Sequence, residues 1–243
     1  MELKICHLYP DVLNLYGDGG NIICMKKRLE WRGIKADVSS LKIGESASLA
    51  DFDLFFMGGG QDFEQEVLLE DLHGGKDKNI ISAIEDGKTF LTVCGGYQML
   101  GHYYENQAGV RCDFLGAIDF YTKAEPGRLI GNFSFRCLPH SGGSIVVGFE
   151  NHGGRSYLGP GVSPLGKIIR GRGNNGGDKS EGVRYNNVFG TYSHGPVLPK
   201  NPALCDHILL TALRLRHPEA ELAPLDDSLE LAARDHMLAI IEK

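Results

Sequence analysis

KTFLTVCGGYQMLGHYY, at Lys88–Tyr104, is the segment with the strongest structural signal in the sequence. Thr89–Val93 is rich in β-branched and aromatic residues, as expected for a strand that is buried on both faces. We predict a sharp turn at the following CGG and then a helix over residues 97–104. A cysteine in such a turn, here Cys94, is held with its sulfur at the carboxyl end of the strand, as in the nucleophile elbows of hydrolases. The start of the helix favours the thiolate, because its N–H groups and dipole stabilise negative charge.

The chain before this turn alternates between strand-like and helix-like segments. Apolar or β-rich runs bounded by glycine indicate strands, and amphipathic stretches between them indicate helices. Alternation of this kind produces βαβ units, so we predict an α/β fold with a flavodoxin-like, doubly wound, mostly parallel sheet. The predicted strands are Leu3–Leu8, Asp37–Leu41 and Asp53–Gly60, and the predicted helices lie at residues 22–29 and 78–86.

The middle of the chain has a different character. Short β-like pieces are separated there by Gly, Pro and Asn, which indicates a small antiparallel extension of the fold. The last predicted strand delivers His194 into a turn. No repeat or linker divides the chain, so we predict a single domain over residues 1–243 with a helical tail at about 219–243. The predicted elements of this half are strands at residues 115–121, 129–135, 145–149 and 188–196 and helices at 202–217 and 225–241.

The composition narrows the classes of function. The formal net charge is −6 and no Lys/Arg run stands out, so a nucleic acid is not an expected partner. No apolar run approaches the roughly 20 residues of a transmembrane helix, and the N-terminus lacks the pattern of a secretory signal. The six cysteines are scattered without a C-x-x-C pair, so no metal site is expected. We therefore expect a cytoplasmic protein, which could reach the inner face of the membrane only through a complex.

Two further turns are expected to lie beside Cys94. MGGGQDF follows a predicted strand and should end at the same carboxyl edge of the sheet, where open α/β folds bind ligands. The backbone N–H groups of Gly59 or Gly60, with that of Gly95, would form an oxyanion hole. His194 follows the last strand and is predicted to act as the base for the thiol. The alternative, an ordinary core cysteine beside plain glycine turns, is less favoured because Cys94 stands in an elbow.

Several motifs resemble those of one enzyme family. V-C-G-G-Y-Q-M-L-G resembles the nucleophile motif of class I glutamine amidotransferases, especially the CobB/CobQ-like branch, and Y-S-H-G-P resembles the histidine motif of that branch. YGDGGN, GGGQDFEQ, GFENHGGRSYLG and VFGTYSHGPVLPKNP resemble, in this order, segments of the GatD subunits of lipid II isoglutaminyl synthases. The resemblance implies that Cys94 is the nucleophile, that His194 is its base, and that Gln98 and Arg128 bind the substrate. A guanidinium suits this role because it can grip the α-carboxylate of glutamine with two hydrogen bonds.

The histidine motif departs from the general class I pattern. Those enzymes usually carry a glutamate two residues after the histidine, whereas this chain has Pro196. A histidine base works best when a carboxylate holds its other ring nitrogen. The resemblance implies that a Mur-ligase-like partner subunit, called MurT, supplies this carboxylate, and Asp18 and Glu150 are the in-chain alternatives. If the partner supplies it, the isolated chain should hydrolyse glutamine slowly.

These features predict the glutaminase subunit of an amidotransferase. It would release ammonia from L-glutamine through a thioester on Cys94. The resemblance implies that the partner of the heterodimer uses that ammonia to convert the D-glutamate of lipid II to D-isoglutamine. No cofactor is expected in this chain, and ATP and Mg²⁺ would belong to the partner, because the chain has no G-x-x-x-x-G-K-[ST] loop. Two rival predictions are the glutaminase part of another synthetase, of the cobyrinic acid type, and a non-catalytic or redox-sensing DJ-1-like thiol protein.

Overall fold

The fold is built around a six-stranded sheet with the strand order β11-β12-β4-β3-β1-β2. This computed structural model describes residues 1–60 and 62–242, without the side chains of residues 62–66. Neighbouring strands from β2 to β12 are parallel, and β11 is antiparallel to β12, which confirms the predicted mostly parallel sheet. The strands are β1 (Glu2–Leu8), β2 (Lys35–Leu41), β3 (Leu54–Met57), β4 (Thr89–Val93), β11 (Val183–Tyr185) and β12 (Val188–Thr191).

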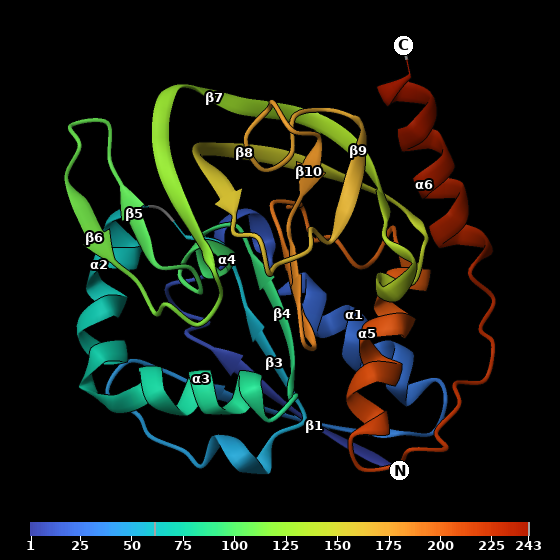
Figure 1. The fold of residues 1–243 in the computed structure, drawn as a ribbon. Coiled ribbons are helices and arrows are strands. Elements are labelled where there is room, and N and C mark those ends of the chain that lie inside the picture. Colours follow the sequence, from blue (N-terminus) through green and yellow to red (C-terminus); the bar gives the residue numbers. More distant parts are fainter. Residues whose placement is uncertain (61, 243) are drawn as a thin grey trace.

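Helices cover both faces of this sheet. Figure 1 shows α3 on one side of β1, β3 and β4, and α1 and α5 together on the other side. Every residue of β3, β4 and β12 is buried, as expected for parallel strands that are covered on both faces. The helices are α1 (Gly20–Glu30), α2 (Asp62–Asp71), α3 (Asp77–Glu85) and α5 (Pro202–Arg214), with short helical turns at Leu15–Gly17, Leu49–Asp51, Leu72–Lys76 and Pro139–Ser141.

The predicted antiparallel extension is a second sheet rather than a small addition. Its strand order is β10-β9-β7-β5-β6, with β8 also paired to β7, and Figure 1 shows it lying across one end of the main sheet. The register of the long β7–β8 ribbon shifts between Ala124 and Leu129, where the sequence E-P-G interrupts β7. Pro and Gly are rare inside regular strands, so the sequence predicted several short strands in place of the long strand β7. The strand predicted at 115–121 begins only at Phe120. The strands are β5 (Tyr103–Glu105), β6 (Arg111–Asp113), β7 (Phe120–Cys137), β8 (Ile145–Leu158), β9 (Gly166–Arg170) and β10 (Ser180–Glu181).

The helix predicted over residues 97–104 is wrong. Helix α4 is a single turn, Gly95–Gln98, and β5 follows shortly after it. The chain pairs with the second sheet from this point, because the N–H group of His102 donates to the Phe120 carbonyl at 2.8 Å. Gly101 permits this approach, since a Cβ at that position would lie 2.8 Å from the Phe120 carbonyl oxygen. Long-range pairing therefore overrides the local helix propensity of the segment.

The described chain ends in helix α6 (Ser228–Ile241), which is the predicted C-terminal helix. Figure 1 shows α6 at the edge of the molecule beside the second sheet, where it packs against β7 and β8. None of its residues is fully buried. Within residues 1–60 and 62–242, no helix is both long and apolar enough to cross a bilayer. The single-domain organisation stays a prediction.

Candidate active site

Four parallel strands bring the candidate residues to one edge of the main sheet. The loop after β1 carries Asp18, β3 leads to Gly59, β4 ends at Cys94, and His194 follows β12. The strand order reverses between β1 and β3, because β2 lies on one side of that pair and β4 and β12 lie on the other. Ligands in open α/β sheets bind outside the carboxyl ends of the strands at such a reversal. The fold itself therefore places these side chains where a ligand is expected.

Cys94 occupies a strained turn between β4 and α4, as the sequence predicts. Its backbone φ of 48° lies in the left-handed region, which is rare for a residue with a side chain and typical of a nucleophile elbow. The turn is packed tightly, since a Cβ at Gly96 would lie 2.7 Å from the Gly58 carbonyl oxygen. Only 6% of Cys94 is exposed, but the residue lines a cavity. Cys94 is thus sheltered from bulk water and open to a bound ligand.

His194 is held beside a carboxylate in the loop after β12. Its backbone N–H group donates to the Phe149 carbonyl at 2.9 Å, which ties the loop to β8. His194 Nδ1 lies 3.3 Å from Asp18 Oδ2, and both side chains are completely buried. In the described part of the chain, His194 Nε2 has no hydrogen-bond partner of normal geometry. One ring nitrogen is therefore held by a carboxylate, and the other can take the thiol proton of Cys94.

Asp18, rather than Glu150, is the in-chain carboxylate at this histidine. Glu150 accepts hydrogen bonds from two backbone N–H groups of the loop after β9, both at 2.8 Å. Asp18 Oδ2 faces His194 and also accepts the Gly59 N–H group at 2.8 Å. The geometry therefore does not require a carboxylate from a partner subunit, because Asp18 already occupies that place.

The electrostatic environment of His194 favours its charged form. Burial opposes the charged imidazolium, but the negative charge on Cys94 and the Asp18 carboxylate outweigh burial, and the pKa of His194 is raised to about 10. A thiolate paired with an imidazolium is the reactive form of a cysteine nucleophile. The site is thus arranged to hold a proton on His194 beside the Cys94 sulfur.

Of the two alternatives predicted as oxyanion donors, Gly59 and Gly60, the structure favours Gly60. The N–H group of Gly59 already donates to Asp18, so it is not available to an oxyanion. The N–H group of Gly95 stands at the first residue of α4, where it has no acceptor within the helix, and Gly60 lines the cavity. A Cβ at Gly59 would lie 2.6 Å from His194 Cε1 and 3.0 Å from Asp18 Oδ2. Gly59 is therefore a glycine because these two side chains meet beside it.

A cavity of about 440 Å³ opens at Cys94 and has the size of a small-molecule site. Arg128 lines it, with its Nε donating to the side-chain oxygen of Asn151 and its Nη2 to the Asn151 carbonyl, both at 2.9 Å. These bonds fix the guanidinium plane, and none of the described carboxylates forms an ion pair with Arg128, so its charge can serve an anionic ligand. Gln98 is buried in the same wall and donates to the Tyr192 hydroxyl at 3.1 Å. The structure thus brings together the predicted residues Cys94, Gln98 and Arg128.

Sequence reasoning missed Tyr16, which bridges two parts of this cavity. The Asn151 side-chain amide donates to the Tyr16 hydroxyl, and the Tyr16 ring lies edge-on to the His194 ring with centroids 4.8 Å apart. Tyr16 also has a positive φ of 57°, which is a strained conformation for a bulky residue. Through Asn151 and Tyr16, Arg128 is connected to His194. Tyr16 is the first residue of the YGDGGN motif, and this motif is the only feature of the sequence that could have indicated its role.

Sequence reasoning also missed His152, the residue after Asn151 in the GFENHGGRSYLG motif. The His152 ring stacks on Tyr192 with centroids 3.6 Å apart, and burial lowers the pKa of His152 to about 3, so the ring is neutral. Its Nδ1 donates to the Gly154 carbonyl at 2.7 Å, which leaves Nε2 as a hydrogen-bond acceptor.

Within the described residues, no group of three or more His, Cys, Asp or Glu side chains could hold a metal ion.

The chain is similar to known glutamine amidotransferases. Residues 4–202 match the CobB/CobQ-like glutamine amidotransferase domain. The chain is 40% identical to subunit GatD of the glutamine-hydrolyzing lipid II isoglutaminyl synthase of Staphylococcus aureus (strain N315), over 98% of this chain and 95% of that protein. It is 38% identical to the GatD subunit of the same enzyme from Streptococcus pneumoniae (strain ATCC BAA-255 / R6), over 89% of this chain and 82% of that protein.

The fold is also similar to that of a solved structure. A glutamine amidotransferase from Thermotoga maritima superimposes with a TM-score of 0.54 at 14% identity, over 99% of this chain and 93% of that chain. At this identity the likeness concerns the fold alone, and it confirms the predicted fold class. The domain match covers most of the chain and includes both Cys94 and His194. The chain therefore belongs to the CobB/CobQ-like glutamine amidotransferase family.

Proposed function

We propose that the chain is the glutaminase subunit of a lipid II isoglutaminyl synthase. The observation that carries this proposal is the arrangement of Cys94, His194 and Asp18 at a cavity whose wall holds Arg128. A nucleophile, a base and its orienting carboxylate suit amide hydrolysis, and a fixed guanidinium suits the α-carboxylate of an amino acid. The high identity to two GatD subunits supports lipid II as the final acceptor.

In the proposed reaction, glutamine binds with its α-carboxylate at Arg128 and its carboxamide at Cys94. The Cys94 sulfur attacks the carboxamide carbon, and the N–H groups of Gly60 and Gly95 stabilise the oxyanion. The C–N bond then breaks as His194 gives its proton to the leaving ammonia, which leaves a γ-glutamyl thioester. Water attacks the thioester while His194 takes a proton from it, and glutamate leaves with the thiol restored.

The acceptor reaction belongs to a partner in this proposal. A MurT-like, Mur-ligase-like subunit forms a heterodimer with the chain, binds ATP and Mg²⁺, and activates the α-carboxylate of the D-glutamate in the lipid II stem peptide. Ammonia from Cys94 then replaces the activating group, and D-isoglutamine results. This chain contributes no cofactor, and the complex works in the cytoplasm at the inner face of the membrane, where lipid II is made available to it.

Transfer of labelled nitrogen tests this function. The chain and its Mur-ligase-like partner are mixed with ATP, Mg²⁺, lipid II and glutamine labelled with ¹⁵N in the amide. We expect the label in lipid II, and we expect Cys94→Ala to abolish transfer while Cys112→Ser, at a half-exposed cysteine outside the cavity, keeps it. Glutamate release without lipid II labelling would point to another acceptor. No hydrolysis by the intact complex would instead favour a thiol protein without glutaminase activity.

A further inference from the structure

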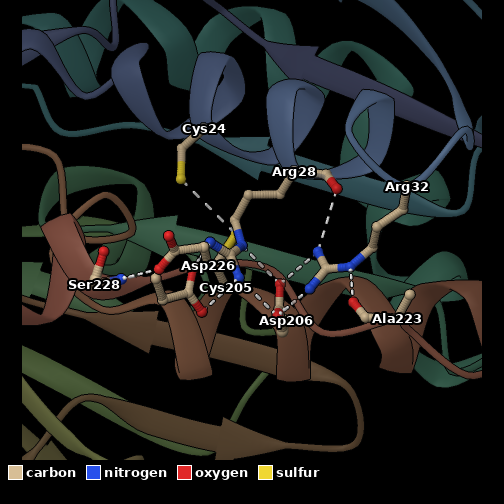
Figure 2. Close-up of polar contacts among 9 residues, drawn as sticks. Cys24, Arg28, Arg32, Cys205, Asp206, Ala223, Asp226 and Ser228 are labelled. Carbon is tan, nitrogen blue, oxygen red and sulfur yellow. Dashed lines mark hydrogen bonds and ion pairs between the residues drawn. The ribbon is translucent and has the colours of Figure 1, made fainter.

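Cys24 and Cys205 form a pair of neighbouring thiols outside the cavity at Cys94. Their sulfurs lie 4.0 Å apart, with Cys24 on α1 and Cys205 on α5 (Figure 2). Both are free thiols. Cys24 is half-buried and lines a cavity of about 250 Å³ together with Trp31 and Pro199, whereas Cys205 is completely buried. A small oxidant in this cavity can therefore reach the sulfur of Cys24, which in turn lies against the sulfur of Cys205.

Buried ion pairs hold the two helices at this contact. Arg28, one helical turn after Cys24, donates through Nε and Nη2 to the two carboxylate oxygens of Asp206 at 2.7 and 2.8 Å. Arg32 donates to the same carboxylate at 3.0 and 2.6 Å. Figure 2 shows both guanidinium groups converging on Asp206, next to Cys205 in the sequence. Because paired, two-point hydrogen bonds fix geometry, α1 and α5 keep the two sulfurs facing each other.

The two thiols have different acidities. The hydrogen bond with Cys205 lowers the pKa of Cys24, and the positive charge of Arg28 adds to this effect although burial opposes it. Burial raises the pKa of Cys205 well above its usual value. The thiolate is the form that attacks peroxides, so Cys24 is the residue expected to react first. Cys205 is then placed to resolve the product.

We propose that Cys24 and Cys205 are a redox modification site, at which a peroxide converts the two thiols to a reversible disulfide between α1 and α5. In the first step the Cys24 sulfur attacks one peroxide oxygen, the O–O bond breaks, and the other oxygen leaves as water after taking a proton. In the second step the sulfur of Cys205 attacks the sulfenic acid sulfur, the S–O bond breaks, and a second water carries away the Cys205 proton. Two thiols and one hydrogen peroxide thus give one disulfide and two water molecules.

This disulfide would act on the glutaminase site through the first turn of α1. A disulfide has an S–S distance of about 2.05 Å, so the present 4.0 Å must shorten, by rotation of the two side chains together with an adjustment of α1 against α5. The first turn of α1 is tied to the loop after His194, because the Leu198 N–H group donates to Asn21 Oδ1 at 3.0 Å. Asp18 lies two residues before α1 begins. We therefore expect the cross-link to disturb the contact between Asp18 and His194 and to lower glutaminase activity reversibly.

Peptide mapping tests the modification without reference to glutaminase activity. The full chain is treated with hydrogen peroxide, the remaining thiols are alkylated, and the digest is analysed under non-reducing conditions. We expect a peptide pair joined through Cys24 and Cys205 that separates on addition of dithiothreitol. Cys24→Ser and Cys205→Ser should each remove the pair, and Cys112→Ser should not. Peroxide oxidation of the folded chain that gives only sulfinic acid at Cys24, or a different pair, would overturn the proposal.

A comparison of two proteins tests the effect on activity. A nucleophilic cysteine such as the one proposed at Cys94 can also react with peroxide, so the wild type and Cys24→Ser are treated side by side and their glutamate release is measured before and after dithiothreitol. Oxidation of Cys94 affects both proteins equally, and the disulfide affects only the wild type. We expect an additional loss in the wild type that dithiothreitol restores. Equal losses, with the disulfide present in the wild type, would show that the cross-link does not reach the glutaminase site.

Discussion

The carboxylate of Asp18 lies 3.3 Å from Nδ1 of His194, with both side chains completely buried. The same carboxylate oxygen accepts the Gly59 N–H group at 2.8 Å. The Gly59 bond fixes the carboxylate, and the carboxylate in turn fixes the tautomer and orientation of the imidazole. The loops after β4, β12 and β1 thus bring together the proposed nucleophile Cys94, the proposed base His194 and the carboxylate of Asp18.

Removing the charge of Asp18 should slow glutamine hydrolysis by the isolated chain. Loss of the orienting carboxylate in a serine protease lowers kcat by about 10⁴ without removing the base, and we expect Asp18→Asn to lower kcat by about 10³ to 10⁴. KM should change little, because Asp18 does not line the cavity. Asp11→Asn, at an exposed aspartate, is the control. An unchanged kcat in Asp18→Asn would show that Asp18 does not orient His194, and would favour a carboxylate of the partner subunit in that role.

The raised pKa of His194, about 10, predicts the alkaline limit of activity. Proton transfer to the leaving ammonia requires the imidazolium, and this pKa belongs to the ligand-free protein, so kcat/KM should persist as pH rises and fall as pH passes through that pKa. Burial lowers the pKa of His194, and Asp18 is one of the groups that raise it, so Asp18→Asn should move the alkaline limb to lower pH. A pH profile of kcat/KM from about 6 to about 11 measures this. A lower kcat with an unmoved limb would indicate a merely structural role for Asp18.

A methyl group at Gly59 should damage catalysis more than folding. In Gly59→Ala the new Cβ would lie 2.6 Å from His194 Cε1, so the imidazole must move. Misplacement of a catalytic group by about 1 Å can lower the rate about 10²-fold, and we expect a loss of kcat of this order. Gly161→Ala is the matched control, because nothing lies within 4 Å of the Cβ that it adds. Wild-type kcat in Gly59→Ala would show that His194 does not stand where we place it during catalysis.

The guanidinium of Arg128 should act in binding. Hydrogen bonds to a charged group contribute about 1.5–3 kcal/mol, so Arg128→Ala should raise KM for glutamine by about 10- to 150-fold. Arg128→Lys should recover only part of this loss, because a lysine keeps the charge but lacks the planar fork. Arg170→Ala, at an exposed arginine outside the cavity, should leave KM unchanged. A wild-type KM for glutamine in Arg128→Ala would show that Arg128 does not bind the substrate.

The positions of Cys94 and His194 could be predicted from the sequence because each residue closely follows a strand. Thr89–Val93 was assigned with its observed bounds, and the parallel sheet then places Cys94 and His194 at one edge. Asp18 could be named only as one of two alternatives, because its loop after β1 has no pattern that shows where it folds. The hydrogen bond that occupies the Gly59 N–H group depends on that same loop, so the sequence could not decide between Gly59 and Gly60 as oxyanion donors.

The second sheet could not be predicted in full because its pairing is long-range. Strands β7 and β8 join residues such as Phe120 and Leu158, and a local pattern does not reveal such a register. The Pro and Gly at the irregularity of β7 divided one strand into apparent pieces. The same pairing ended helix α4 after one turn, although the local sequence favours a longer helix. Tyr16 and His152 were missed since their roles arise only when this sheet meets the main one.

Labelling by an electrophilic glutamine analogue reports directly on whether Cys94 and His194 form a glutaminase site. We expect peptide mapping to find the adduct on Cys94, glutamine to protect against labelling, and His194→Ala to slow labelling by about 10²-fold or more. Cys112→Ser should label at the wild-type rate. An adduct on another cysteine, or labelling of Cys94 that depends on neither glutamine nor His194, would contradict the assignment of a glutaminase site at the carboxyl edge of the sheet.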